Sequence, residues 1–170
     1  MQYDGIAISG VQIGADAALY ETLPHTDGAV NLVMLHGGIG TACGEDMINL
    51  NLLKNRGIDY LALGHIHAAS GLLREGKTFY AWPGCAMGRG FDELGEKGVY
   101  IGSAGKETCE LRFQPLSARK YEILSVPAGD DAYAAILAAL PEQTQRDIYR
   151  ILLTGEAEPV SLQALYRALE

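Results

Sequence analysis

Cysteine is scarce in this sequence, and positive charge is in the minority. The three cysteines, Cys43, Cys85 and Cys109, are odd in number, widely spaced and form no C-x-x-C pair. This pattern argues against a disulfide framework or a zinc knuckle and is typical of reduced thiols in the cytoplasm. Lysine and arginine number 13 against 21 acidic residues, a net charge of −8. Nucleic-acid binding would therefore need a local basic patch or metal ions, because overall attraction is absent.

Long apolar runs are also missing. The N-terminus has no basic segment followed by an apolar stretch, and no run approaches the roughly 18 residues that span a bilayer. We therefore expect neither membrane insertion nor secretion. The chain has 170 residues, 48% of them hydrophobic, which is enough to bury a sizeable core in one domain, with or without a small appendage.

Three of the four histidines follow apolar, strand-like runs. Residues 31–35 end in His36, and residues 60–63 lead into Gly64-His65-Ile66-His67. Between the two runs, residues 45–55 have a helical apolar period, which Gly57 would stop. The pattern predicts a strand-helix-strand unit. Its strands would deliver histidine at their C-terminal ends, where open α/β sheets place their sites.

The spacing of His65 and His67 bears on metal binding. If the backbone stays extended, side chains at i and i+2 point to opposite sides and could serve two neighbouring ions. A single histidine at a strand end is more often hydrogen-bonded or exposed than a ligand. His36, at the end of a neighbouring strand, favours a convergent site suited to zinc, manganese, iron, cobalt or nickel. Hydrolytic two-metal sites also use anionic oxygen ligands, which this histidine set lacks.

From residue 71 onward the pattern changes to short alternating segments. Antiparallel hairpin strands are predicted over residues 72–74, 78–82, 98–102 and 108–114, with turns at 75–76, 83–84 and 104–105. A strand over 119–126, a helix over 130–140, a strand over 146–154 and a helix over 161–169 would complete the chain. We therefore expect two domains, residues 1–118 and a β-α-β-α appendage over 119–170.

A glycine-rich loop follows Trp82. One interpretation is a long structural turn. The functional interpretation is that Pro83-Gly84 lets the backbone approach a metal centre closely, while Arg89 contacts a phosphate. Cys85 has no activating partner nearby in sequence and is interpreted as a structural thiol. Trp82 is expected to pack in the core and not to bind a base.

Three segments together resemble the calcineurin-like metallophosphoesterase superfamily, in particular the bacterial DNA repair exonucleases of the SbcD type. They are Leu35-His36-Gly37, Leu63-Gly64-His65-Ile66-His67 and the loop from Pro83-Gly84 through Arg89 to Lys97-Gly98. The resemblance covers residues 30–103 and weakens beyond about 119, where the appendage is similar to that branch's small α/β cap. It implies a four-layer α/β/β/α sandwich and two divalent ions, often manganese, with zinc or iron as alternatives.

By motif, the resemblance implies His36 and His65 as ligands of one ion and His67 as a ligand of the other. The family's first three motifs, Asp-x-His, Gly-Asp-x-x-Asp and Gly-Asn-His, do not occur in this sequence. We therefore expect the C-terminal half of such an enzyme, with no intact catalytic set, weak metal binding and no hydrolysis by the chain alone.

The resemblance also implies DNA as a partner and an ATPase partner subunit. Half a sandwich would expose sheet edges and apolar faces, which favours a homodimer. Two alternatives stay open. One is a small phosphoester substrate, which the acidic charge favours slightly, and the other is a non-catalytic module for protein binding or oligomerisation.

Overall fold

The computed structural model describes residues 1–10, 20–23, 25–40, 46–54, 56–116, 119–129, 131–155, 161, 163 and 167. Backbone proximity divides the chain into two compact units. The first comprises Met1–Ala86 and Lys97–Leu116, and the second Met87–Glu96 and Ser117–Glu170. The segment Met87–Glu96, which contains Arg89, thus groups with the second unit. The expected domain boundary after residue 118 stays a prediction.

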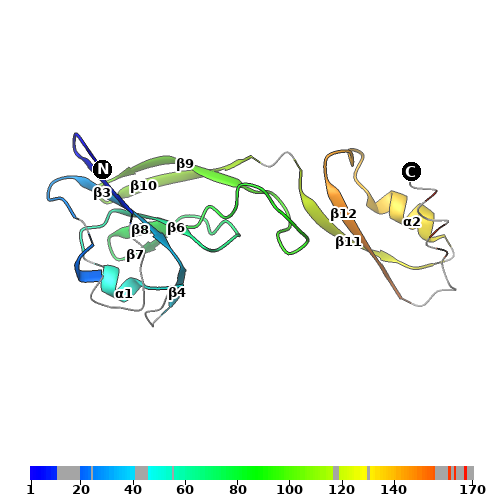
Figure 1. The fold of residues 1–170 in the computed structure, drawn as a ribbon. Helices are drawn as coiled ribbons and strands as arrows, with labels where there is room; N and C mark the ends of the chain where they lie inside the picture. Colours follow the sequence, from blue (N-terminus) through cyan, green and yellow to red (C-terminus); the bar gives the residue numbers. More distant parts are fainter. Residues whose placement is uncertain are drawn as a thin grey trace. The chain divides into compact units, whose positions relative to one another are not determined.

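One sheet forms the base of the first unit (Figure 1). Its strands are β1 (Gln2–Tyr3), β2 (Ile6–Gly10), β3 (Val30–His36), β6 (Tyr60–Gly64), β7 (Leu73–Glu75) and β8 (Thr78–Ala81). They lie in the order β1-β2-β3-β6-β8-β7. The four middle strands are parallel, and the two edge strands pair antiparallel. With the helices described below, these strands confirm the predicted mixed α/β class.

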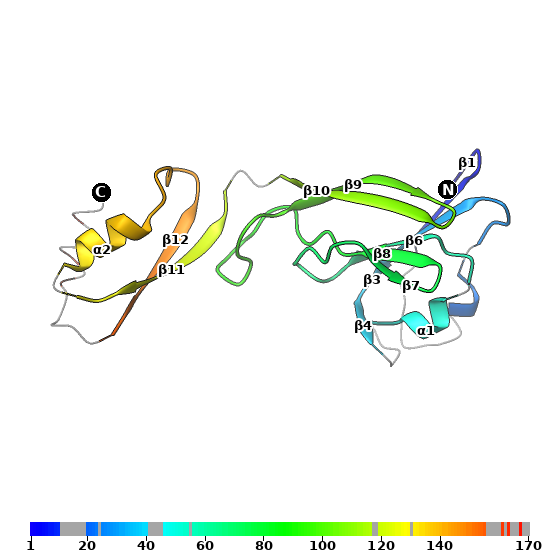
Figure 2. The ribbon, with the colours of Figure 1, turned by 180° about the vertical axis from the view of Figure 1, so that it is seen from behind.

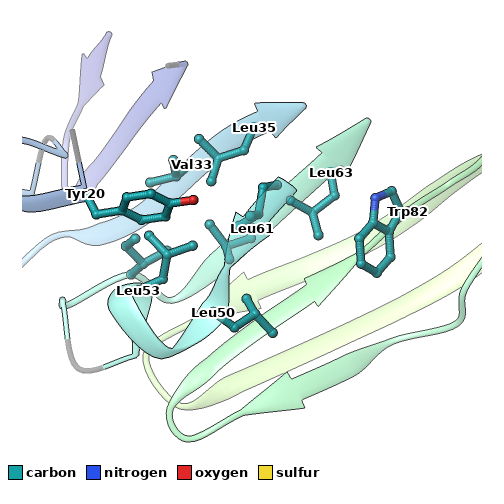
Figure 3. Close-up of a cluster of buried hydrophobic side chains, with 10 residues drawn as sticks. Tyr20, Val33, Leu35, Leu50, Leu53, Leu61, Leu63 and Trp82 are labelled. Atoms are coloured by element: carbon teal, nitrogen blue, oxygen red, sulfur yellow. The ribbon is translucent and has the colours of Figure 1, made fainter. Parts of the chain in front are cut away.

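Alternation along the central strands builds the core of this unit. In β3, Asn31, Val33 and Leu35 are buried, while Met34 and His36 are exposed, as expected when successive side chains point to opposite faces. Figure 3 shows the apolar side chains gathered on the buried face. The cluster comprises Tyr20, Val33, Leu35, Ile48, Leu50, Leu53, Ile58, Leu61, Leu63 and Trp82. The prediction that Trp82 packs is therefore confirmed, since it is only 5% exposed.

An antiparallel hairpin of β9 (Gly98–Gly105) and β10 (Thr108–Pro115) faces the sheet (Figure 2). Between them is a cavity of about 560 Å³, lined mainly by apolar side chains that include Leu32, Met34 and Leu111. Lys106, in the hairpin turn, places its Nζ 2.9 Å from Oδ2 of Asp59. The hairpin is therefore tied to the segment that leads into β6.

The segment between β3 and β6 differs from the predicted helix over residues 45–55. Residues 45 and 55 lie outside the described residues. Within the described part, a short strand β5 (Met47–Asn49) pairs with β4 (Gly38–Gly40), and only Leu50–Leu53 form helix α1. The helix begins only at Leu50, because the Asn49 side chain caps it there by accepting a hydrogen bond from the Asn51 N–H. The prediction was wrong in length because strand pairing takes the first apolar residues.

Two predicted turns also differ. Strand β9 continues through Gly105, so the hairpin turn lies at Lys106 and Glu107, where Glu107 adopts a φ of +62°. Strand β8 forms the predicted hairpin with β7, but its other neighbour is β6 in parallel pairing. Residues 83–84 therefore begin a long connection between two different sheets and do not form a hairpin turn.

The second unit contains a parallel strand-helix-strand element. Strand β11 (Tyr121–Pro127) pairs with β12 (Ile148–Thr154), and helix α2 (Ala132–Ala139) packs against β11. The Asp131 side chain accepts a hydrogen bond from the Ala134 N–H and caps the helix. These elements confirm the two predicted strands and the helix between them, although residue 130 and most of 161–169 lie outside the described residues. No helix in the described ranges is long and apolar enough to cross a membrane.

Candidate metal centre

Two neighbouring parallel strands bring His36 and His65 to the same edge of the sheet. His36 is the last residue of β3, and His65 directly follows Gly64, the last residue of β6. His36 and Gly64 are register partners, so the two imidazoles start from adjacent backbone positions. Their ring centroids are 5.3 Å apart, with an interplanar angle of 81°. The structure therefore brings together two of the three predicted histidine ligands.

The backbone turns at His65. Its φ is +93°, in a region that residues other than glycine rarely occupy. The condition of an extended backbone, under which His65 and His67 would point to opposite sides, is therefore not met, because β6 ends at Gly64. Backbone strain of this kind concentrates at functional sites, where surrounding contacts hold it in place.

Trp82 supplies one such contact from the end of the next strand. Its indole Nε1–H donates to the carbonyl oxygen of Gly37 at 3.0 Å and to that of Gly64 at 3.1 Å. The Gly37 N–H also donates to the Gly64 carbonyl at 3.3 Å. One buried donor therefore joins the backbone after His36 to the backbone before His65, which limits how far the two rings can separate.

Gly64 leaves room for the His36 ring. A Cβ atom added at Gly64 would lie 2.9 Å from Nδ1 of His36, closer than a side chain tolerates. The glycine of the Gly64-His65-Ile66-His67 motif is thus explained by the close approach of an imidazole from the neighbouring strand, and its own φ is not positive.

Asp46 lies beside His36 and His65, although the sequence did not predict it as a site residue. The nitrogen and oxygen ligand atoms of His36, Asp46 and His65 all lie within 4.8 Å of one another, and all three residues are exposed. The Gly38 N–H donates to the Asp46 carbonyl oxygen at 2.8 Å, which places this residue beside the end of β3. No periodicity in the sequence signals that approach, because it results from the pairing of the short strands β4 and β5.

The donor set fits a divalent transition metal. Imidazole nitrogen and carboxylate oxygen both bind ions such as zinc at about 2.0–2.2 Å, so two ligand atoms on one ion lie within about 4.4 Å. The separations of up to 4.8 Å between His36, Asp46 and His65 are slightly larger. Small rotations of these exposed side chains would close the difference.

Within the described part of the first unit, the group of ligand atoms at this edge comes from His36, Asp46 and His65, and His67 does not belong to it. Its carbonyl oxygen accepts hydrogen bonds from Lys97 Nζ at 3.4 Å and from the Cys85 thiol at 3.6 Å. Gly84, with a φ of +84°, approaches the same backbone, and an added Cβ would lie 2.9 Å from the His67 carbonyl oxygen. The close approach predicted for Pro83-Gly84 is therefore to the chain at His67, and the Cys85 thiol has a structural contact.

Arg89 lies in the second unit, where its guanidinium Nη2 is 3.5 Å from Oε1 of Glu93. The Glu93 carboxylate also accepts a hydrogen bond from the Arg89 backbone N–H at 2.8 Å. The Arg89 side chain is 73% exposed, while that of Glu93 is 6% exposed. The carboxylate thus holds the loop backbone firmly and the guanidinium only loosely, so a role for Arg89 in phosphate binding stays a prediction.

No protein-family model matches this chain. Over 114 residues it is 32% identical to the uncharacterized metallophosphoesterase YhaO of Bacillus subtilis (strain 168). The chain is similar to a metallophosphoesterase. The match covers 65% of this chain but 26% of YhaO, so the chain spans about a quarter of that relative's length. The similarity supports the superfamily that the histidine motifs resemble.

Proposed function

We propose that this chain forms a metal-binding edge of a divalent-metal-dependent phosphoesterase. The observation that carries the proposal is the meeting of His36 and His65, with ring centroids 5.3 Å apart, at the ends of neighbouring parallel strands. The similarity to a metallophosphoesterase supports it. Divalent ions in such sites activate water and stabilise the charge that develops during displacement at phosphorus.

Different residues of this chain would bind the metal ions and the phosphate group. His36 and His65 would hold one ion, and His67 would contribute to a second. Arg89 would bind a phosphate oxygen through its guanidinium, which would first have to leave its 3.5 Å contact with Glu93.

The proposal requires ligands that this sequence does not contain. The Asp-x-His, Gly-Asp-x-x-Asp and Gly-Asn-His motifs are absent from it, so a complete two-metal centre would need another polypeptide segment. That segment would also be needed to complete a four-layer sandwich. The chain by itself is expected not to hydrolyse phosphoesters.

For the substrate we propose DNA, acted on by an exonuclease of the SbcD type with an ATPase partner subunit, on the strength of the motif resemblance. The second candidate is a small phosphoester. The net charge of −8 favours it, because an acidic protein repels the DNA backbone. A homodimer that covers the exposed Met34 and Ile101 side chains, 51% and 52% exposed, is a further proposal.

The decisive test combines this chain with a polypeptide that carries the three missing motifs. Manganese-dependent hydrolysis of a chromogenic phosphodiester and of linear DNA would be measured for the pair. We expect activity with the unaltered chain, and its loss with His36→Ala or His65→Ala. His25→Ala is the matched control, because His25 lies away from this edge and contacts Asp27. Full activity in both site variants would sink the proposal.

A further inference from the structure

Asp46 adds a carboxylate to the pair of imidazoles at the edge of the sheet. The motif resemblance assigns only two histidines to one ion and leaves the anionic ligands to motifs that the sequence lacks. In the structure, Asp46 supplies a carboxylate oxygen within 4.8 Å of ligand nitrogens on both His36 and His65. The three donors come from one unit of the chain.

The position of Asp46 is built into the fold. It directly precedes β5, which pairs with β4 in the register Gly38 with Met47. The hydrogen bond from the Gly38 N–H to the Asp46 carbonyl extends that pairing by one step towards His36. An added Cβ at Gly37 would lie only 3.1 Å from the Asp46 carbonyl oxygen, so the two segments are in close contact.

We propose that His36, Asp46 and His65 form a single-ion site whose protein ligands all come from this chain. The inference deepens the proposed function and rests on its assignment of the two histidines. Two imidazoles and one carboxylate suit divalent zinc, cobalt, iron or manganese better than calcium or magnesium, which prefer oxygen ligands throughout.

An ion held at this site would remain accessible to solvent. Three protein ligands leave at least one coordination position open, which distinguishes catalytic from structural zinc sites. All three residues are exposed, so water or a phosphate oxygen can reach that position. Affinity should exceed the weak binding expected of two histidines alone, because an anionic ligand adds direct charge attraction to the ion.

The test uses the full 170-residue chain and cobalt(II), whose visible absorption reports its coordination. We expect one bound ion per chain, with binding abolished in His36→Ala. Asp46→Asn should weaken binding by at least about 10–100-fold, the range that even outer-shell partners of a metal contribute. Asp4→Asn, at an exposed position in the turn between β1 and β2, is the matched control and should bind like the unaltered chain.

Asp46→Cys separates a ligand from a residue that only orients a histidine. A thiolate bound directly to cobalt gives an intense ultraviolet charge-transfer band, which should appear in Asp46→Cys and not in Asp4→Cys. Weakened binding in Asp46→Asn without that band would overturn the assignment of Asp46 as a ligand. Unchanged binding in Asp46→Asn would overturn it too and leave the histidine pair standing. Failure of the unaltered chain to bind cobalt would overturn this three-ligand site. The proposed metal-binding edge, which also uses ligands from another segment, is tested separately by hydrolysis in the combined proteins.

Discussion

The indole Nε1–H of Trp82 donates a hydrogen bond of 3.1 Å to the carbonyl oxygen of Gly64. The same group lies 3.0 Å from the Gly37 carbonyl oxygen, so one side chain spans both strand ends that present histidine. Trp82 is also part of the apolar core. The geometry at the edge of the sheet therefore depends on a residue that packs beneath it and would not itself bind a metal.

Replacing Trp82 by phenylalanine should damage both stability and metal binding. The change removes the only N–H of the side chain and leaves the buried Gly37 carbonyl without this donor, which costs about 1–3 kcal/mol of unfolding free energy. Metal affinity should fall because the two histidine segments are then less firmly joined. Urea unfolding and cobalt titration measure the two effects. Tyr80→Phe is the control, since Tyr80 packs against the Trp82 ring at 5.9 Å; equal cobalt affinity in Trp82→Phe and the unaltered chain would contradict the prediction.

Replacing Gly64 by alanine should weaken metal binding while the chain still folds. Its φ is compatible with alanine, but the new Cβ would lie 2.9 Å from Nδ1 of His36 and force the ring aside. We expect cobalt affinity to fall about 10-fold or more, by analogy with outer-shell changes, with a cooperative melting transition retained. Gly10→Ala tests specificity, since Gly10 ends the neighbouring strand β2 and its added Cβ would meet Met34 at an ordinary 3.4 Å. A loss of equal size in Gly10→Ala would count against a local effect.

Replacing His65 by glycine should stabilise the metal-free chain and abolish metal binding. A residue in a sparsely populated backbone region stores about 1–3 kcal/mol, and glycine adopts a φ of +93° without that cost. After the loss of chain entropy that glycine brings, we expect a net gain of about 1 kcal/mol in urea unfolding. His67→Gly is the comparison, because His67 has no positive φ and its replacement should destabilise. A destabilised His65→Gly chain would show that the His65 side chain contributes more than the strain.

Alkaline pH should weaken the first unit through Tyr60. Burial, with smaller effects of Cys109 and Tyr100, raises the pKa of Tyr60 to about 12. Between pH 10 and 12 the unfolded chain has lost this phenol proton while the folded chain keeps it, so the free energy of unfolding falls as pH rises. Because Tyr60 is only half-buried, we expect a loss of about 1–2 kcal/mol.

Urea unfolding of the unaltered chain and of Tyr60→Phe at pH 9.5 and 11.5 measures this effect. Phenylalanine has no proton to lose, so the variant should retain that 1–2 kcal/mol across the interval. Identical pH dependence in the two proteins would exclude Tyr60 as the cause.

The pattern of apolar runs predicted much of the fold. The apolar runs over residues 31–35 and 60–63 were expected to be strands, and they lie at the centre of the sheet within β3 and β6. The apolar runs predict the strands, but only alternate side chains of β3 are buried, and Met34 on its other face is 51% exposed. The segment 45–55 failed as a single helix because a short apolar run is compatible with either period until its partners are known. Its partner, Gly38–Gly40, has glycine at two of its three positions, so no side-chain pattern indicates the pairing.

The candidate site, too, could be predicted only in part from the sequence. His36 and His65 could be predicted because both follow strands whose ends meet at one edge. Asp46 could not be predicted, since it reaches that edge through a backbone hydrogen bond to Gly38 across eight positions of sequence. The turn at His65 could not be predicted either, because backbone dihedrals at a strand end depend on contacts with other segments.

Local composition and period were enough to predict the class of fold and the two strand ends that carry His36 and His65. Which side chains converge at that edge depends on long-range contacts. Trp82 joins the two strand ends, Gly64 admits the His36 ring, and Asp46 completes the set. Each of these relationships links residues that are distant in sequence, and their distances of a few ångströms arise only when the sheet has formed.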